Sequence, residues 1–205
     1  MRLYYAPGAC SLSPHIVLRE ADRRFDLERV DLKTHRTASG IDFTTINPKG
    51  YVPALQLDGP GTPVLTEGPA IVQYIADLAQ DARLAPPNGT FARYHLQEWL
   101  NFISTELHKS FGPLFNPATP EDYKPIAKDT ITKRFAFVDQ HLAKRGPFLL
   151  GGQFSVADAY LFVMTFWANY LKMDLSSWPH LKMYSERVAA RPHVREAMKE
   201  EGLAN

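Results

Sequence analysis

The sequence predicts two domains of different class: an α/β domain with a four-stranded mixed sheet over residues 1–80, and an all-helical domain over residues 91–205. Three observations support this division. Short strand-like runs are confined to the first 80 residues. The Pro- and Gly-rich stretch "QDARLAPPNGT" is typical of a linker, placed at residues 81–90. Beyond it, long helical periodicities replace the strand signals.

The N-terminal segment carries the order strand–helix–strand, then strand–strand–helix. "RLYYA" ends at a Pro-Gly turn, and "SPHIVLREAD" begins a helix with Ser11 or Ser13 as N-cap and Pro14 in its first turn. "FDLERVDL" alternates like a strand, and residues 33–50 are irregular. "PALQL" and "PVLT" flank the turn "DGPG" as a hairpin, and "EGPAIVQYIADLAQ" is an amphipathic helix. A parallel crossover and an antiparallel hairpin combine in one mixed sheet, which has a thioredoxin-like outline.

The C-terminal half shows helical patterns over residues 91–115, 121–145, 155–172 and 178–200. Within the third pattern, "SVAD" places Ser155 three residues before Asp158, which is the spacing of a capping box. The sequence that follows, "AYLFVMTFWANYL", is apolar on all sides and predicts a buried helix.

Composition excludes several functional classes. The 23 Lys and Arg residues balance 22 Asp and Glu residues, for a net charge of +1, so we expect neither a nucleic acid nor an anionic membrane as partner. No apolar run approaches the roughly 20 residues that span a bilayer, and the N-terminus lacks a signal-peptide pattern. One cysteine and no cluster with metal-ligand spacing predict no metal site. We therefore expect a soluble, cytoplasmic protein.

The single cysteine, Cys10, lies between the end of a predicted strand and the start of a predicted helix. Helix N-termini stabilise anions, so this position favours a thiolate. The motif is Cys10-Ser11-Leu12-Ser13, which has no second cysteine, so a redox cycle would need an external thiol. The alternative interpretation is a buried cysteine that only fills space.

Two further stretches suggest a site for a peptide-like ligand. In "GYVPAL", Pro53 directly precedes a strand; at the matching position of a thioredoxin-like sheet, a cis bond turns the backbone of Val52 outward to pair with an added strand. In "LTEGPAIVQYI", the helix N-terminus offers N–H groups to a carboxylate, and Glu67 can accept from an ammonium group. The alternatives are an ordinary loop proline and a glutamate that caps its helix.

One polar stripe marks the first helix of the second domain. Glu98, Asn101, Thr105 and His108 fall at helical spacing and share a face. Such a stripe is usually solvated, and it gains a function only where it faces a site.

Six stretches, in order along essentially the whole chain, resemble the glutathione transferases, and most closely the bacterial beta class. They are "YYAPGACSLSPHI", "NPKGYVPALQLD", "LTEGPAIVQYIAD", "EWLNFISTELHKSFGPLF", "SVADAYLF" and "WPHL" with "RVAARPHVREAM". The resemblance implies a glutathione-binding domain over residues 1–80, an acceptor-substrate domain over residues 91–205, and a homodimer. It implies that glutathione is the co-substrate and that no metal takes part.

The same resemblance implies roles for individual residues. Cys10 would lie beside the glutathione sulfur and form a mixed disulfide with it, and Val52 would pair its backbone with the cysteinyl unit. Glu67 and Gly68 would bind the γ-glutamyl end. The helical domain would contribute Asn101, Thr105, Glu106, Leu107 and His108, with His108 near the sulfur.

Two departures from the family pattern concern the glycyl and the γ-glutamyl ends of glutathione. His35 stands where many relatives have a lysine that reaches the glycyl carboxylate, with Lys33 or Arg36 as candidate substitutes. Gly68 stands where most classes have serine, so only backbone N–H groups remain there. We expect Tyr5 to pack at the strand end, and Ser11 to be an additional donor to the sulfur.

The activity implied is attack of the glutathione thiolate on a hydrophobic electrophile, including displacement of halide, as in detoxification. Four aromatic residues are candidates for the acceptor pocket or, more simply, for the core: Phe111, Phe115, Phe166 and Trp167. Two alternatives stay open. One is a glutaredoxin-like reductase or glutathione-dependent peroxidase that uses Cys10, and the other is a non-enzymatic glutathione-binding module.

Overall fold

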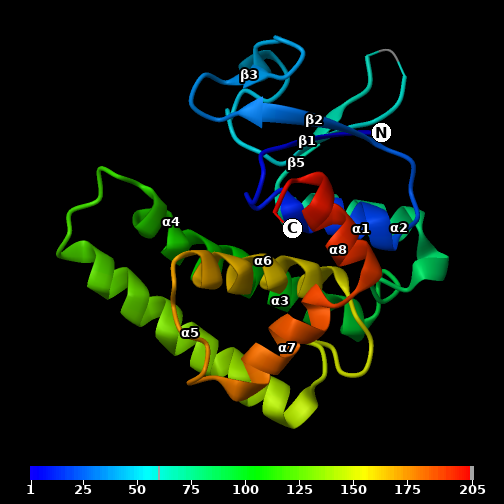
Figure 1. The fold of residues 1–205 in the computed structure, drawn as a ribbon. Coiled ribbons are helices and arrows are strands. Elements are labelled where there is room, and N and C mark those ends of the chain that lie inside the picture. The colour runs from blue at the N-terminus through cyan, green and yellow to red at the C-terminus, as the bar shows by residue number, and fades with distance from the viewer. Residues whose placement is uncertain (60, 204–205) are drawn as a thin grey trace. The chain divides into compact units, whose positions relative to one another are not determined.

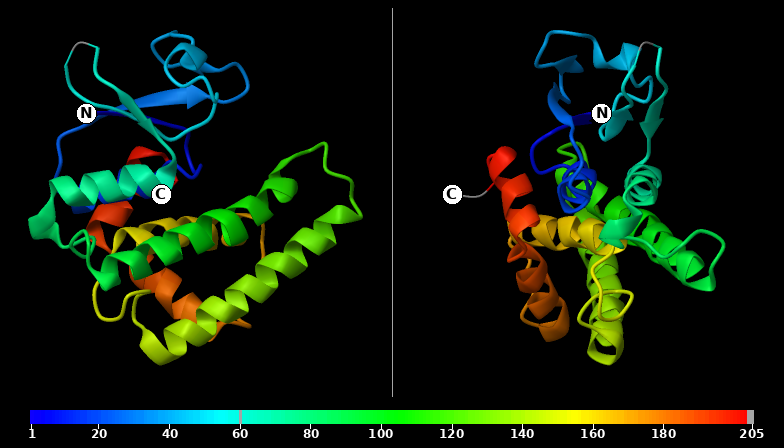
Figure 2. Two further views of the ribbon diagram at one scale, coloured as in Figure 1. Left: turned by 180° about the vertical axis from the view of Figure 1, so that it is seen from behind. Right: turned by 90° about the vertical axis from the view of Figure 1, so that its right-hand side faces the viewer.

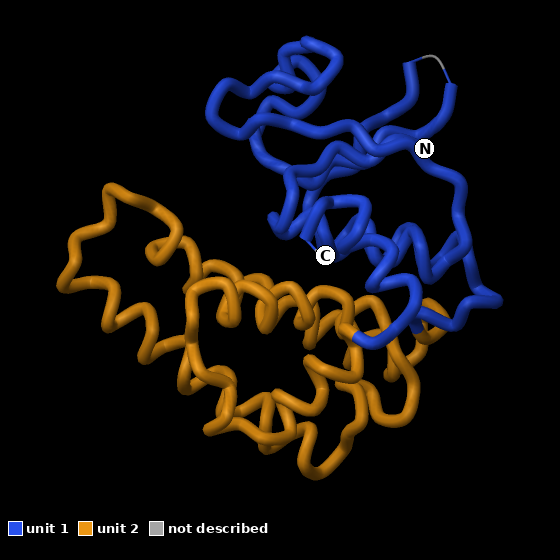
Figure 3. The backbone as a smooth tube through the Cα atoms, viewed as in Figure 1, with its two compact units in different colours: residues 1–85, 190–205 blue, residues 86–189 orange. Residues whose placement is uncertain are grey.

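The computed structural model describes residues 1–59 and 61–203, and its contacts divide the chain into two compact units (Figure 3). Unit 1 comprises Met1–Ala85 with Ala190–Asn205, and unit 2 comprises Pro86–Ala189. The sequence placed residues 91–205 in one helical domain. Residues 190–205 group with unit 1 instead, because the last helix packs against the first helix of the chain.

Unit 1 is built on a mixed sheet of five strands, in the order β3-β2-β1-β4-β5. The strands are β1 (Arg2–Tyr5), β2 (Asp26–Asp31), β3 (Arg36–Thr37), β4 (Ala54–Gln56) and β5 (Val64–Thr66). The pair β1–β2 is parallel, and β4 is antiparallel to both β1 and β5. The α/β class and the mixed sheet are confirmed. The additional strand, β3, is a two-residue segment within the stretch that we expected to be irregular.

Three helices lie together on one side of this sheet: α1 (Leu12–Glu20), α2 (Gly68–Leu78) and α8 (Pro192–Glu200) (Figures 1 and 2). The side chains of Leu3, Ile16, Leu55 and Ile75 are completely buried in unit 1. Short 3₁₀ turns occupy Phe43–Thr45 (η1) and Gln80–Ala82 (η2), the second at the start of the predicted linker. Pro60, in the predicted hairpin turn, lies outside the described residues.

Unit 2 is helical, as predicted. The stretch predicted as one helix over residues 91–115 is continuous but changes type: α3 (Phe91–Phe102) runs into a π-helical segment, η3 (Ile103–His108), and then into α4 (Lys109–Phe115). The remaining helices are α5 (Tyr123–Arg145), α6 (Val156–Tyr170) and α7 (Pro179–Ala189). The fourth predicted helical pattern is two helices, α7 and α8, separated just before Pro192.

Helix α6 forms the centre of unit 2, and its first ten residues are buried. Its predicted capping box is confirmed. The Asp158 carboxylate accepts hydrogen bonds from the Ser155 N–H and hydroxyl, at 2.9 and 2.7 Å, and from the Leu149 N–H at 2.9 Å. The Tyr184 hydroxyl donates to the Asp158 carbonyl at 2.8 Å, which fastens α7 to α6.

Within the described residues, no helix is both long enough and apolar enough to cross a membrane.

The buried capping box predicts a pH-dependent stability. Burial raises the pKa of Asp158 from its ordinary 3.8 to about 6, because lost hydration outweighs the hydrogen bonds to its carboxylate. The folded protein then binds this proton more tightly than the unfolded chain does. The contribution of Asp158 to the free energy of unfolding is therefore fully present below about pH 4 and is lost as the pH rises through about 6.

We expect the unfolding free energy of the wild type, minus that of Asp158→Asn, to fall by on the order of 2–3 kcal/mol between about pH 4 and pH 7. Urea unfolding at a series of pH values measures this difference. The control is Ser155→Ala, which removes one donor but keeps the carboxyl group and should keep the pH dependence. A difference that does not change with pH would contradict the account.

Candidate active site

The cysteine lies in the turn between β1 and α1, two residues before the helix begins. Because Tyr4 of β1 is paired with Ala54 of antiparallel β4, the chain leaving β1 runs beside the residues that precede β4. The Cys10 thiol donates a hydrogen bond to the Val52 carbonyl oxygen at 3.3 Å, and Cys10 is half-buried. The structure thus brings two of the predicted site residues into direct contact.

The beginning of α2 adjoins the same place. The Val52–Pro53 peptide bond is cis. Gly68 is the first residue of α2, and a Cβ added to it would lie 3.9 Å from the Pro53 side chain. At this N-terminus the N–H of Gly68 is the donor for an anion, since Pro69 has no N–H and the Ala70 and Ile71 N–H groups donate to the Glu67 carbonyl at 3.0 Å. Cys10, Val52 and Gly68 therefore belong to one cluster in unit 1.

Glu67, at the N-cap position of α2, is held in a strained conformation. Its backbone has φ +70° and ψ 113°, a region that residues other than glycine rarely adopt. Its carbonyl accepts from the Ala70 and Ile71 N–H groups, as an N-cap residue does, but its side chain makes no capping hydrogen bond. Its Oε1 atom instead accepts from Lys49 Nζ at 2.5 Å and from the Tyr51 hydroxyl at 2.8 Å.

Lys49 and Tyr51 are the functional candidates that sequence reasoning missed. Their hydrogen bonds to Glu67 raise the pKa of both side chains, which keeps the lysine charged and the phenol protonated. The signal was present in "NPKGYVP", where a cation and a phenol lie three residues and one residue before Val52. Only the fold shows that this segment returns to meet a carboxylate from the start of α2.

His35 lies in the turn between β2 and β3, with φ +52°. Its ring lies against Gly50, since a Cβ at Gly50 would be 3.2 Å from the imidazole Cε1 atom. The imidazole Nδ1 atom is buried and has no hydrogen-bond partner among the described residues. His35 therefore adjoins the segment that carries Lys49 and Val52. Of its proposed substitutes, Arg36 donates to the Gly40 carbonyl at 3.1 Å.

Two residues beside the cysteine have structural contacts. The buried Ser11 hydroxyl accepts from the Ala6 N–H and donates to the Ala6 carbonyl, both at 3.2 Å. It closes the turn, in place of the expected bond to sulfur. The Tyr5 ring lies 6.3 Å from the His15 ring, and burial is the largest cause that raises the pKa of its hydroxyl. These contacts agree with the expected role of Tyr5, which is packing at the end of β1.

In unit 2, the predicted stripe does not stay on one face. Glu98, Asn101 and Thr105 are exposed, whereas His108 is half-buried against α6. The π-helical segment η3 is the physical reason. Its hydrogen bonds reach one residue further than those of an α-helix, so residues at its end are rotated away from positions extrapolated at 3.6 residues per turn.

The other predicted residues of this helix have different surroundings. The Thr105 hydroxyl donates to the Asn101 carbonyl at 3.0 Å. Glu106 forms an ion pair with Arg134 of α5 at 2.7 Å. Leu107 is completely buried, which supports a packing role.

His108 has the most specific environment of these residues. Its Nδ1 atom lies 2.6 Å from the Tyr160 hydroxyl, and the two rings are nearly perpendicular, with centroids 5.8 Å apart. The Trp167 ring, also on α6, lies 4.9 Å away. The imidazole is therefore fixed in position by one helix.

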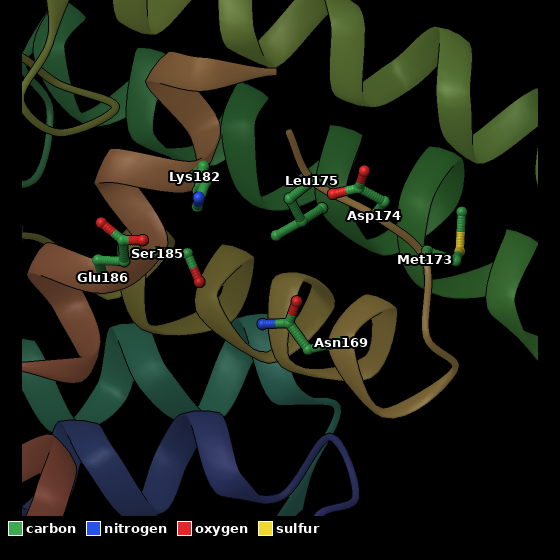
Figure 4. A pocket seen from close by; sticks show the side chains of 7 residues that line it. All are labelled: Asn169, Met173, Asp174, Leu175, Lys182, Ser185 and Glu186. Carbon is green, nitrogen blue, oxygen red and sulfur yellow. The ribbon is translucent and has the colours of Figure 1, made fainter. Parts of the chain in front are cut away.

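A separate small cavity of about 210 Å³ lies between the end of α6 and α7, lined by residues that include Asn169, Lys182 and Ser185 (Figure 4). None of the predicted site residues lines it. In the part of the chain that the structure describes, no group of three or more His, Cys, Asp or Glu side chains is arranged to hold a metal ion.

Comparison with known proteins gives matches along nearly the whole chain. Residues 1–77 match the model of the glutathione S-transferase N-terminal domain, and residues 102–192 match that of the C-terminal domain. The glutathione S-transferase GstA of Escherichia coli O157:H7 is 47% identical over 203 residues, covering 99% of this chain and 100% of that protein.

Two solved structures show the same fold at considerable identity. A sphingomonad glutathione S-transferase in complex with glutathione is 46% identical, with a TM-score of 0.94 and full coverage of both chains. A bacterial beta-class glutathione S-transferase from Sphingomonas chungbukensis is also 46% identical, with a TM-score of 0.95 and full coverage of both chains. With both domain models matched in order, this chain belongs to the glutathione S-transferase family, a family of enzymes.

Proposed function

We propose that this enzyme transfers the thiolate of glutathione to hydrophobic electrophiles, including aryl halides from which chloride is displaced. The observation that carries the proposal is the contact between the Cys10 thiol and the Val52 carbonyl, next to the N-terminus of α2. This arrangement brings a polar backbone segment, the N–H of Gly68 and a sulfur together within unit 1. A relative with the same fold is described in complex with glutathione, which supports glutathione as the ligand.

The cluster around Glu67 suits the γ-glutamyl end of glutathione, which carries an ammonium and a carboxylate. Glu67 is the acceptor for the ammonium, and the N–H of Gly68 is a donor for the carboxylate. Lys49 and Tyr51 fix the orientation of the Glu67 carboxylate. The positive φ of Glu67 supports this role, since backbone strain of about 1–3 kcal/mol persists mainly at functional positions.

The cysteinyl unit of glutathione is assigned to the backbone of Val52, so its sulfur would lie near Cys10. The glycyl carboxylate is assigned to the segment where the His35 ring lies against Gly50. The family resemblance supports glutathione contacts for Asn101, Thr105, Glu106 and His108.

Aromatic side chains of unit 2 support an apolar electrophile. Trp167 lies between His108 and Phe115, with ring centroids 4.9 and 5.2 Å away. Phe115 also lies 6.3 Å from Tyr170, and both of these side chains are exposed. Phe111 is completely buried and belongs to the core. The exposed pair Phe115 and Tyr170 is therefore the proposed apolar contact for the acceptor.

In the proposed reaction, the glutathione sulfur gives up its proton to water and forms a bond to the electrophilic carbon, and chloride leaves with the electron pair of its bond. The protein contributes proximity of the two substrates and stabilisation of the thiolate. We further propose a homodimer, on the family resemblance alone, and a cytoplasmic location, where glutathione is kept reduced.

We expect Glu67→Gln to raise the KM for glutathione by about tenfold or more, because charge-assisted hydrogen bonds contribute roughly 1.5–3 kcal/mol. The kcat at saturating glutathione should change little. Steady-state kinetics with a chlorinated dinitrobenzene measure both constants. The matched control is Glu28→Gln, at a strand carboxylate that accepts from the Ser39 N–H at 2.9 Å outside the cluster. An unchanged KM in Glu67→Gln would rule out the assigned role.

The variant Cys10→Ala distinguishes conjugation from thiol–disulfide exchange. With oxidised glutathione, the Cys10 thiolate would attack one sulfur, form a mixed disulfide and release one glutathione thiolate. We expect intact-protein mass spectrometry to show one added glutathione on the wild type and none on Cys10→Ala. We expect Cys10→Ala to retain conjugation, since the attacking sulfur belongs to glutathione.

If Cys10→Ala instead loses all activity and the wild type conjugates poorly, the enzyme is a reductase on this fold. If the wild type is retained on a glutathione affinity matrix but neither conjugates glutathione nor forms a mixed disulfide with it, the chain is a glutathione-binding module without this chemistry.

A further inference from the structure

The contact between His108 and α6 has a chemical consequence that depends on proton positions. The Tyr160 side chain is almost completely buried, with 3% of its surface exposed, and its hydroxyl lies 2.6 Å from His108 Nδ1. Tyr160 and Trp167 lie seven residues apart on α6, two helical turns, so they project from the same face of the helix. Between them, they fix the imidazole in position and orientation.

Two arrangements of the protons would satisfy this hydrogen bond. In one, the phenol donates to an unprotonated Nδ1. In the other, an Nδ1–H donates to the phenol oxygen. A phenol is a stronger hydrogen-bond donor than a neutral imidazole N–H, and an imidazole nitrogen is a better acceptor than a phenol oxygen. The first arrangement pairs the stronger donor with the stronger acceptor, so it is favoured for neutral His108.

We propose that Tyr160 is a positioning residue that holds neutral His108 in the tautomer with its proton on Nε2. In this tautomer the nitrogen opposite Tyr160 is a hydrogen-bond donor, suited to a developing or formed thiolate. In the other tautomer that nitrogen would be an acceptor and would repel a thiolate. This inference deepens the proposed function and rests on it, since it assigns a proton to the histidine expected near the glutathione sulfur.

The π-helical segment contributes to this arrangement. His108 is its last residue, and the segment packs against α6. In a regular α-helix, His108 would continue the exposed line of Asn101 and Thr105. The local change of helix type turns the imidazole toward Tyr160, which is consistent with the frequent occurrence of π-helical turns at functional sites.

The first test measures the tautomer directly, without reference to activity. Nitrogen NMR of the enzyme with isotope-labelled histidine distinguishes a protonated from an unprotonated ring nitrogen, and His108→Gln identifies the signals of His108. We expect the wild type to show Nε2 protonated and Nδ1 unprotonated, and Tyr160→Phe to show a mixture of the two tautomers. A wild-type spectrum with the proton on Nδ1 would overturn the inference, whatever the enzyme catalyses.

The second test measures the consequence for the reaction. We expect Tyr160→Phe to lower kcat by about tenfold, with the KM for glutathione within about twofold of wild type. The matched control is Tyr184→Phe, which removes another buried hydroxyl of unit 2, one that donates to the Asp158 carbonyl and not to a histidine. The control should lower the midpoint of thermal unfolding but retain kcat.

A double-mutant cycle links the two residues. If Tyr160 acts through His108, Tyr160→Phe has no further effect on kcat in the His108→Gln background. A full tenfold loss in that background would contradict the inference, as would equal losses of kcat in Tyr160→Phe and Tyr184→Phe. If the wild type does not conjugate glutathione at all, the proposed function fails, while the NMR result still decides the tautomer.

Discussion

The candidate site depends on the position of β1 in the middle of its sheet. This strand pairs with β2 on one side and with β4 on the other, in opposite senses. The antiparallel pairing with β4 brings the turn after β1 to the residues that precede β4, so the Cys10 thiol meets the Val52 carbonyl. A slip of one residue between β1 and β4 would turn alternate side chains to the opposite face and separate these groups.

Each unit holds one polar side chain in a defined orientation. In unit 1, Lys49 and Tyr51 hold the carboxylate of Glu67 at a strained N-cap position. In unit 2, a π-helical segment ends at His108 and turns its imidazole onto Tyr160. In both cases the backbone departs from regular α-helical geometry at the residue that is proposed to contact glutathione. Local departures of this kind are expected where function outweighs ideal structure.

The sequence predicted the two classes of domain because strand alternation, helical periodicity and the Pro- and Gly-rich linker are local signals. The capping box at Ser155 and Asp158 could also be predicted, since its two residues are only three positions apart. The ion pair of Lys49 with Glu67 could not be predicted, because only the fold brings together these residues, which are 18 positions apart in the sequence. The polar stripe was extrapolated with the α-helical period, so the rotation at His108 was missed. The packing of α8 on α1 is likewise a long-range contact that no local pattern encodes.

The central claim is that the cluster around Cys10, Val52 and Glu67 binds glutathione and stabilises its thiolate. The most direct measurement is the ultraviolet absorption of the thiolate when glutathione is added to Cys10→Ala enzyme over a range of pH. This variant removes the protein's own thiol from the signal. The account predicts that bound glutathione ionises at a lower pH than glutathione in solution, and that Glu67→Gln weakens the signal by weakening binding. Ionisation at the same pH as in solution, at saturating glutathione, would contradict it.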